Sequence, residues 1–213
     1  MPAVFLARFA SMLDRGLLAG KDNGDLRHDA LVRHAKDALD AAPTGRREPF
    51  GIVHCARDGT GMRATFRAWW TTWSATSGWV DHRLPLPDHS ALAFAYGTGA
   101  AAVETANLAW SSSLAGRTSR AVFSAFCDAL RSGQDPRSGG GPQLVGLYRK
   151  GCGEMFGVIF HGTPYLLGMR ASESMNLGIV EWRNELFERC DPSSLRRLPD
   201  AQPHARPRGI PSA

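Results

Sequence analysis

Features that mark several common functional classes are scarce or absent from this sequence. There are four cysteines, Cys55, Cys127, Cys152 and Cys190, and no two of them form a C-x-x-C pair. This spacing excludes the usual zinc-knuckle and redox-dithiol motifs. Widely separated cysteines favour reduced thiols in a cytosol-like compartment over a disulfide framework. H-E-x-x-H and paired-carboxylate motifs are also absent, so we predict no metal and no cofactor.

Long hydrophobic runs are absent too. The most apolar stretch near the N-terminus, residues 1–19, is interrupted by Arg8 and Arg15. We therefore expect neither a signal-peptide core nor a membrane span there. An amphipathic, arginine-bearing stretch is also compatible with a mitochondrial presequence, although Asp14 and the scarcity of serine count against it. The expectation is a cytoplasmic protein without a membrane segment, with an organellar matrix as the alternative.

The basic charge is modest and dispersed. The formal net charge is +5 and the sequence pI is about 9.4, yet no run of five or more Lys or Arg occurs. The arginines of the second half are spread over several predicted elements and the tail: Arg117, Arg120, Arg131, Arg137, Arg149, Arg170, Arg196, Arg197, Arg206 and Arg208. Arginines contact phosphates where they cluster, and the sequence does not show that these do. A nucleic-acid partner is therefore the weaker alternative to a protein partner or self-association.

What the sequence does contain is enough apolar material for a sizeable core. Hydrophobic residues make up 43% of 213 residues, and a chain of this size needs no disulfide staples. Residues 2–18 and 25–42 place apolar side chains at helical spacing around a turn that contains glycine. Asp25 is expected to cap the second helix. The first predicted domain, residues 1–45, is therefore an N-terminal helical hairpin.

The second predicted domain, residues 46–192, is an α+β core. An Asp-Gly turn between aromatic and threonine-rich segments predicts a β-hairpin. The expected elements, in chain order, are strands 50–56 and 62–73, an extended segment 79–86, a strand 91–96, a buried helix 100–113, a helix 118–131, a loop 133–141, strands 144–148 and 155–160, and a helix 181–190. Prolines and arginines in residues 193–213 predict a disordered or partner-bound tail.

Aromatic and histidine side chains supply the main candidate binding site. Trp69, Trp70 and Trp73 fall close together, and an enzyme would require a pocket that combines Trp69 and Trp70 with His82 and His161. Clustered tryptophans can stack on bases or sugars, but they more often fill a core or an interface.

Histidines elsewhere offer weaker patterns. Asp81 and His82, with His89 nearby, are the densest titratable group, but neighbours on an extended segment point to opposite faces. A surface loop is the simpler interpretation. His28 and His34 are six residues apart on a helix and do not share a face, so we expect no metal site from this pair.

Two glycine-flanked positions are further candidates. Gly97, Thr98 and Gly99 precede a predicted helix, whose N-terminus can attract an anion. The P-loop lysine is missing, so a packing turn is the alternative. Cys152 lies between two glycines in a predicted hairpin turn near Lys150, which makes it a candidate reactive thiol.

Three segments resemble the proteasome β-subunit, an N-terminal-nucleophile hydrolase. These are FGIVHCARDG at 50–59, ALAFAYGTGAAAVETANL at 91–108, and PQLVGLYRKGCGEMFGVIFHGTPYLLG at 142–168. The resemblance implies an αββα-like layered sandwich. In that family an N-terminal threonine is the nucleophile, and the alignment places Pro49 there. The family's catalytic aspartate and lysine fall near Trp70 and His82.

The resemblance therefore implies a non-catalytic member of the fold that acts through protein–protein interaction or assembly. The alternative from the residues alone is an enzyme or a basic nucleic-acid-binding protein of an unrelated α+β fold.

Overall fold

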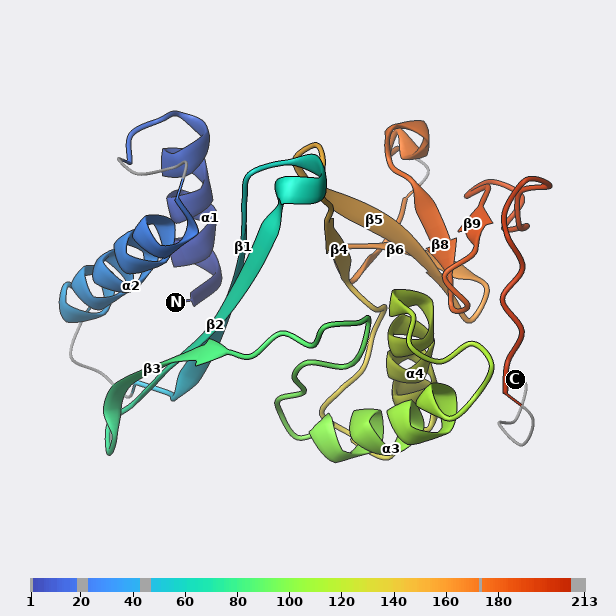
Figure 1. Cartoon of the computed structure of the whole chain (residues 1–213), viewed down its shortest axis with the longest axis horizontal. Helices are drawn as coiled ribbons and strands as arrows, with labels where there is room; N and C mark the ends of the chain where they lie inside the picture. The colour runs from blue at the N-terminus through green and yellow to red at the C-terminus, as the bar shows by residue number, and fades with distance from the viewer. Residues whose placement is uncertain (1, 19–22, 43–46, 173, 208–213) are drawn as a thin grey trace. The chain divides into compact units, whose positions relative to one another are not determined.

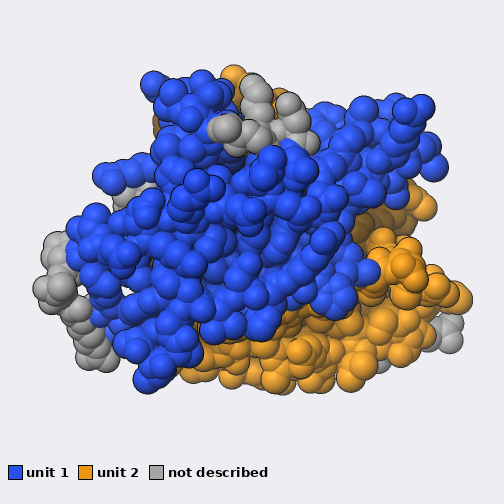
Figure 2. All heavy atoms as spheres, turned by 60° about the vertical axis from the view of Figure 1, so that its left-hand side comes forward, with its two compact units in different colours: residues 1–86, 147–151 blue, residues 87–146, 152–213 orange. Residues whose placement is uncertain are grey.

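The computed structural model describes residues 2–18, 23–42, 47–172 and 174–207. Helices and strands are mixed along the chain, as the predicted α+β class requires (Figure 1). The chain forms two compact units, Met1–Leu86 with Leu147–Gly151, and Pro87–Gly146 with Cys152–Ala213, coloured separately in Figure 2. This division differs from the predicted boundaries at residues 45 and 192, because the N-terminal helices belong to the same unit as the first sheet.

The predicted N-terminal helical hairpin is present as α1 (Pro2–Asp14) and α2 (Gly24–Asp40). Phe9 of α1 packs with Leu31 and Ala35 of α2 and with Ile52 of the neighbouring sheet. The helices therefore bury one apolar face on their own sheet, which is the usual source of helix stability in proteins. The turns predicted around residues 20–24 and 42–45 fall largely outside the described residues.

The N-cap of α2 lies two residues before the predicted one. The side chain of Asn23 accepts hydrogen bonds from the backbone N–H groups of Asp25 and Leu26, at 2.8 and 3.3 Å. Asn23 has extended backbone angles, as an N-cap residue does. The prediction that Asp25 caps the helix is wrong because Asp25 already lies within the first turn.

The sheet of the first unit is a three-stranded antiparallel meander. Its strands are β1 (Phe50–Asp58), β2 (Thr65–Ser74) and β3 (Gly78–Leu84), in that spatial order. The register pairs Phe50 with Trp73 and Asp58 with Thr65, which confirms the predicted hairpin. Its loop contains a short 3-10 helix, Gly61–Arg63, and turns at Gly59, whose φ of +71° favours glycine.

The second unit combines a helix pair with a six-stranded sheet. Its helices are α3 (Ala100–Ser111) and α4 (Ser119–Arg131). Its strands are β4 (Leu144–Leu147), β5 (Gly153–Phe160), β6 (Thr163–Leu166), β7 (Met169–Arg170), β8 (Trp182–Asn184) and β9 (Arg189–Cys190), and Leu177–Ile179 form a 3-10 turn. The order is β7-β6-β5-β8-β9, with β4 also paired to β5, and β8 runs parallel to β5.

Both faces of β5 are covered over its C-terminal half. Val158 points toward α4 and packs against Phe123 and Cys127. Ile159 points to the other face and packs against Trp182. A side chain at Gly157 would place its Cβ 2.3 Å from the Trp182 ring, so this position admits only glycine without a shift of the ring.

Two predicted elements of the second unit are wrong, and a third is less buried than predicted. Residues 91–96 form no strand, because an apolar run alone supplies no hydrogen-bonding neighbour. Residues 181–190 form the β8–β9 hairpin in place of a helix. The Asn184 side chain accepts from the backbone N–H groups of Leu186 and Glu188, and Phe187 adopts a φ of +61°. α3 is a helix as expected, but Trp110 is its only described residue that is buried.

The C-terminal segment is ordered by contacts with its own unit as far as residue 207. Ala201 and His204 are buried, and the backbone N–H of Leu198 donates to Arg189. The prediction of a disordered or partner-bound tail is therefore corrected for residues 193–207, and residues 208–213 lie outside the described part of the chain. Among described helices, none combines the length and apolar character needed to cross a membrane.

Candidate functional site

The three predicted tryptophans do not form one stacking platform. Trp69 is 5% exposed and faces α2, whereas Trp70 lies on the opposite face of β2. The Trp70 ring lies over Gly51, where an added Cβ would approach it to 1.9 Å. Trp73 contacts Phe50, with ring centroids 5.9 Å apart. Packing within the first unit therefore accounts for all three rings.

The two predicted histidines lie in different units. His82 is exposed on β3, opposite Trp70 in the register of β2 and β3. His161 occupies the turn between β5 and β6, where its backbone N–H donates to Glu185 at 2.9 Å. Neither unit by itself contains a pocket that combines His82, His161 and the tryptophans.

The predicted anion site at the start of α3 faces a carboxylate of the protein. Thr98 and Ser138 donate hydroxyl hydrogen bonds to Asp135, at 2.7 and 2.6 Å. A Cβ at Gly99 would lie 3.1 Å from an Asp135 oxygen. Hydrogen bonds from Ser138 and Thr98 lower the pKa of Asp135 below its usual value. An added anion would therefore meet this negative charge.

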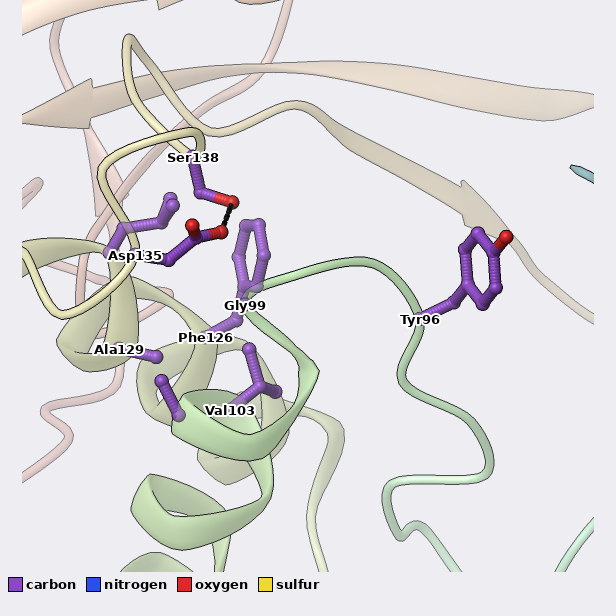
Figure 3. A pocket seen from close by; sticks show the side chains of 9 residues that line it. Tyr96, Gly99, Val103, Phe126, Ala129, Asp135 and Ser138 are labelled. Atoms are coloured by element: carbon purple, nitrogen blue, oxygen red, sulfur yellow. Dashed lines mark hydrogen bonds between the residues drawn. The ribbon is translucent and has the colours of Figure 1, made fainter. Parts of the chain in front are cut away.

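A small pocket lies beside this turn (Figure 3). It is lined by Tyr96, Gly99, Ala102, Val103, Phe126, Ala129, Leu130, Asp135 and Ser138. Apart from the paired Asp135 and Ser138, the side chains that meet here are apolar or aromatic. This lining is typical of a gap in the packing of α3 on α4, and it offers few groups that would bind a polar ligand.

The four cysteines are all free thiols. Cys152 is exposed in the loop between β4 and β5. The reactivity of its thiol stays a prediction. Cys127 and Cys190 are buried, and burial raises the pKa of both thiols.

A polar centre that sequence reasoning missed lies between α2 and the three-stranded sheet. His28 is 3% exposed, and its Nε2 lies 3.0 Å from an Asp81 oxygen. Its other nitrogen, Nδ1, lies 3.2 Å from Nδ1 of His54 on β1. Three elements therefore contribute one side chain each to a continuous hydrogen-bonded chain.

Two further side chains hold this centre in place. The His28 ring stacks on Trp69 with centroids 4.5 Å apart and planes 10° apart. The Thr71 hydroxyl, also buried, donates to Asp81. Rings and carboxylate are thus fixed by packing as well as by hydrogen bonds.

The electrostatics of the centre favour a neutral His54 and an ionised Asp81. Burial, followed by the nearby His28 and Arg27, lowers the pKa of His54 to about 4. Burial works to raise the pKa of Asp81, but hydrogen bonds from Thr71 and His28 outweigh it, and that pKa lies below its usual value.

The sequence does carry one signal for this centre. His28, Leu31, Ala35 and Leu39 are all buried on one stripe of α2, at helical spacing. A histidine on a buried stripe needs a hydrogen-bond partner. Its partners, 26 and 53 residues away, cannot be read from that spacing. Leu26, in the first turn of the same helix, is exposed.

The second unit contains a different polar network, built from ion pairs. Asp128 accepts from Arg131 at 2.7 Å, from Arg206, and from the Trp110 indole N–H at 2.8 Å. Arg131 and Arg206 also pair with Glu185. Two arginines counted as potential phosphate contacts are therefore engaged within the protein.

An apolar surface remains uncovered on the six-stranded sheet. Val145 is 72% exposed, Met155 44% and Met169 63%. They lie on β4, β5 and β7, and are called the Val-Met face below.

Comparison with known proteins provides no relative. No family model matches the chain, and no curated protein or solved structure matches it. Within the described residues, no group of three or more His, Cys, Asp or Glu side chains is arranged to hold a metal ion.

Proposed function

We propose that this protein acts by binding another protein, and that the Val-Met face of the six-stranded sheet is the surface that binds it. The observation that carries the proposal is the exposure of three apolar side chains on one side of a sheet whose strand β5 is covered on both sides over its C-terminal half. Exposed apolar patches of this kind mark interaction sites on proteins.

The side on which these residues lie follows from the sheet geometry. Leu144 packs toward the α4 side, so its neighbour Val145 points to the other side. Met155 precedes Phe156 and shares the side of Ile159 by the same alternation. Met169 is paired with Leu166, which packs against the cluster of Ile159 on that side.

The neighbouring part of this side indicates what kind of partner fits. Ala171 and Leu177 of the chain pack over Ile159 and Trp182, so aliphatic side chains already cover the sheet there. The Val-Met face continues this apolar surface without a cover. Methionine adapts its shape to a partner. The occupant is therefore an aliphatic segment of a second protein.

The proposal keeps the non-catalytic function that the proteasome resemblance implies. Two of the three segments that carry the resemblance form hairpin strands as expected, and the third lacks its strand at residues 91–96. The nucleic-acid alternative is less favoured, because Arg131 and Arg206 are ion-paired to Asp128 and Glu185.

Site-specific photo-crosslinking tests the proposal. A benzophenone side chain placed at Val145 or Met169 is expected to crosslink one partner in cells. The same group at Met62, which is 91% exposed in the first unit, serves as the matched control. No crosslink at the two sheet positions, or an equal yield of the same product at Met62, contradicts the proposal.

The purified partner then allows a quantitative test. We expect the double variant Val145→Glu, Met155→Glu to weaken the Kd at least about tenfold, since buried charge without a partner opposes association. Met62→Glu should leave the Kd unchanged. If the chain alone sediments as a dimer and the double variant sediments as a monomer, the partner is a second copy of this chain and not a different protein.

A further inference from the structure

We infer that a groove in the second unit, between the α3–α4 connection and the C-terminal segment, binds a small organic acid. The chemical class that it selects is a carboxylate on an aliphatic body, and Arg120 is the residue that pairs with the carboxylate. The groove shares no lining residue with the Val-Met face, so the inference does not depend on the function proposed above.

The groove lies where residues 112–118, which follow α3, meet residues 202–207 of the C-terminal segment (Figure 1). Its volume is about 1000 Å³, which is enough for a small organic ligand. Leu114, Ala115, Pro203 and Pro207 give it apolar walls, and Leu114 is fully exposed. None of the residues that line the groove is acidic. The aliphatic body of a ligand therefore has a surface to lie on.

Two arginines line the groove, and only one of them is neutralised. Arg206 pairs with Asp128 and Glu185. Within the described part of the chain, no carboxylate forms an ion pair with the half-buried Arg120. Its guanidinium donates to the carbonyl oxygen of Gln202 at 2.7 Å, and its buried Nε–H has no acceptor among the described residues. A bound carboxylate supplies the missing counter-charge.

The carboxylate of Glu188 acts on Arg120 through its charge but does not pair with it. It is occupied by the side chains of Asn184 and Arg197 and by the backbone N–H of His204. Burial lowers the pKa of the Arg120 guanidinium, and the attraction of Glu188 offsets this effect only in part. The protein itself therefore leaves the charge of Arg120 incompletely compensated.

The first turn of α4 adds backbone donors to this wall of the groove. Thr118, the N-cap, and Arg120 both line the groove. The Thr118 hydroxyl accepts from the backbone N–H of Ala121 at 3.1 Å. The N–H groups of Ser119 and Arg120 have no acceptor within the helix, as is general for a first turn. This end of the helix dipole favours an anion beside Arg120.

A buried histidine in the groove wall is an independent indication of a ligand. His204 is 7% exposed, and its Nδ1 lies 2.9 Å from the carbonyl oxygen of Leu186. Its Nε2 is buried and has no hydrogen-bond partner among the described residues. Buried polar atoms in proteins are nearly always paired. The wall thus lacks a polar partner at His204 as well as at Arg120.

Octanoate, 1-octanol and acetate separate the two halves of the recognised chemistry. We expect octanoate to bind the full chain at pH 7 in titration calorimetry. Acetate lacks the aliphatic body and 1-octanol lacks the charge, so both should bind at least about tenfold more weakly. Equal affinity for acetate would indicate an adventitious ion only. That result, equal affinity for 1-octanol, or no binding of octanoate would overturn the inference.

Arg120→Gln tests the assigned residue. The variant should weaken the Kd for octanoate at least about tenfold and leave that for 1-octanol unchanged, because only the charge is lost. Arg120→Lys keeps the charge and should lose less. Arg196→Gln is the matched control, since it removes the same charge from an exposed arginine outside the groove. An equal loss in Arg196→Gln would assign the effect to net charge and overturn the inference.

Amide chemical shifts of the wild type locate octanoate even if Arg120→Gln does not fold. Octanoate should shift the amides of Ser119, Arg120 and His204. The amides of Met155 and Met169 on the Val-Met face should stay in place. Shifts on the Val-Met face without shifts at the groove would overturn the inference and leave the proposed protein-binding function untouched.

Discussion

The two helical hairpins of this protein both pack on their sheets through apolar side chains, but they hold polar groups beside those contacts in different ways. α2 also contacts β1 and β3 through a buried histidine, His28, whose carboxylate partner Asp81 is 42% exposed. α4 contacts β5 through apolar side chains, with Phe123 and Cys127 against Val158. Its polar residue, Asp128, lies at the margin of that core and is neutralised by two arginines.

The difference shows two ways of burying a polar group next to a sheet. A neutral ring, such as that of His54, avoids the desolvation cost of a charge and needs only correctly directed hydrogen bonds. A nearly buried carboxylate needs cations, and losing one partner of such a pair is far more destabilising than the pair itself is stabilising. The hairpins should therefore respond differently to mutation and to pH.

Trp182→Ala is expected to have the largest effect, and only on the second unit. The ring is 2% exposed and covers Gly157 of β5. Its loss should lower the free energy of unfolding by about 3–5 kcal/mol. Hydrogen exchange should show the loss in β5 and β8 amides. Met169→Ala, on the same side of the sheet but exposed, should change stability by less than about 0.5 kcal/mol.

Asp128→Ala tests the ion-pair half of the comparison. Removing the carboxylate leaves Arg131, Arg206 and the Trp110 indole without this acceptor, so we expect a loss of roughly 3 kcal/mol in denaturant unfolding. Asp200→Ala is the control. Its pair with Arg189 is largely exposed, and its loss should cost below about 1 kcal/mol. Similar losses in both variants would contradict the distinction.

Acid should weaken the first unit through His54. Its pKa is lowered to about 4 in the folded protein from 6.5, so the unfolded state binds more protons between these values. The stability of α2 and β1 should therefore fall as the pH drops from about 6.5 to 4. The Asp81 contribution, from a lowered pKa, is lost only at still lower pH.

The check is amide exchange of the first unit across this pH range. His54→Gln should flatten the slope, because the titrating ring is gone. The same slope in wild type and variant would assign it to another group.

Asn23→Ala is expected to have the smallest effect, about 1 kcal/mol, because one capping side chain is lost from α2. Asp25→Ala should cost less, since Asp25 is not the cap. Thermal unfolding of the two variants side by side decides which residue caps the helix, and a larger loss in Asp25→Ala would reverse the assignment.

Local patterns in the sequence predicted most elements of the fold. Helical spacing identified α1, α2 and α4, and the Asp-Gly turn identified the β1–β2 hairpin. The pattern failed at residues 181–190, where helical spacing of Trp182 and Leu186 was overridden by pairing with β5 and by the turn at Asn184.

The candidate sites depended much less on local pattern. The tryptophans close in sequence were separated by strand alternation, which sends Trp69 and Trp70 to opposite faces. The polar centre instead joins His28, His54 and Asp81 from three elements.

The sequence by itself determined the α+β composition, the N-terminal helical hairpin and the first β-hairpin, because helix periodicity and turn chemistry act over a few residues. Only the tertiary structure decided which apolar residues stay uncovered and which buried histidine finds a carboxylate. Those outcomes depend on contacts between residues far apart in the chain, and no short-range spacing encodes them.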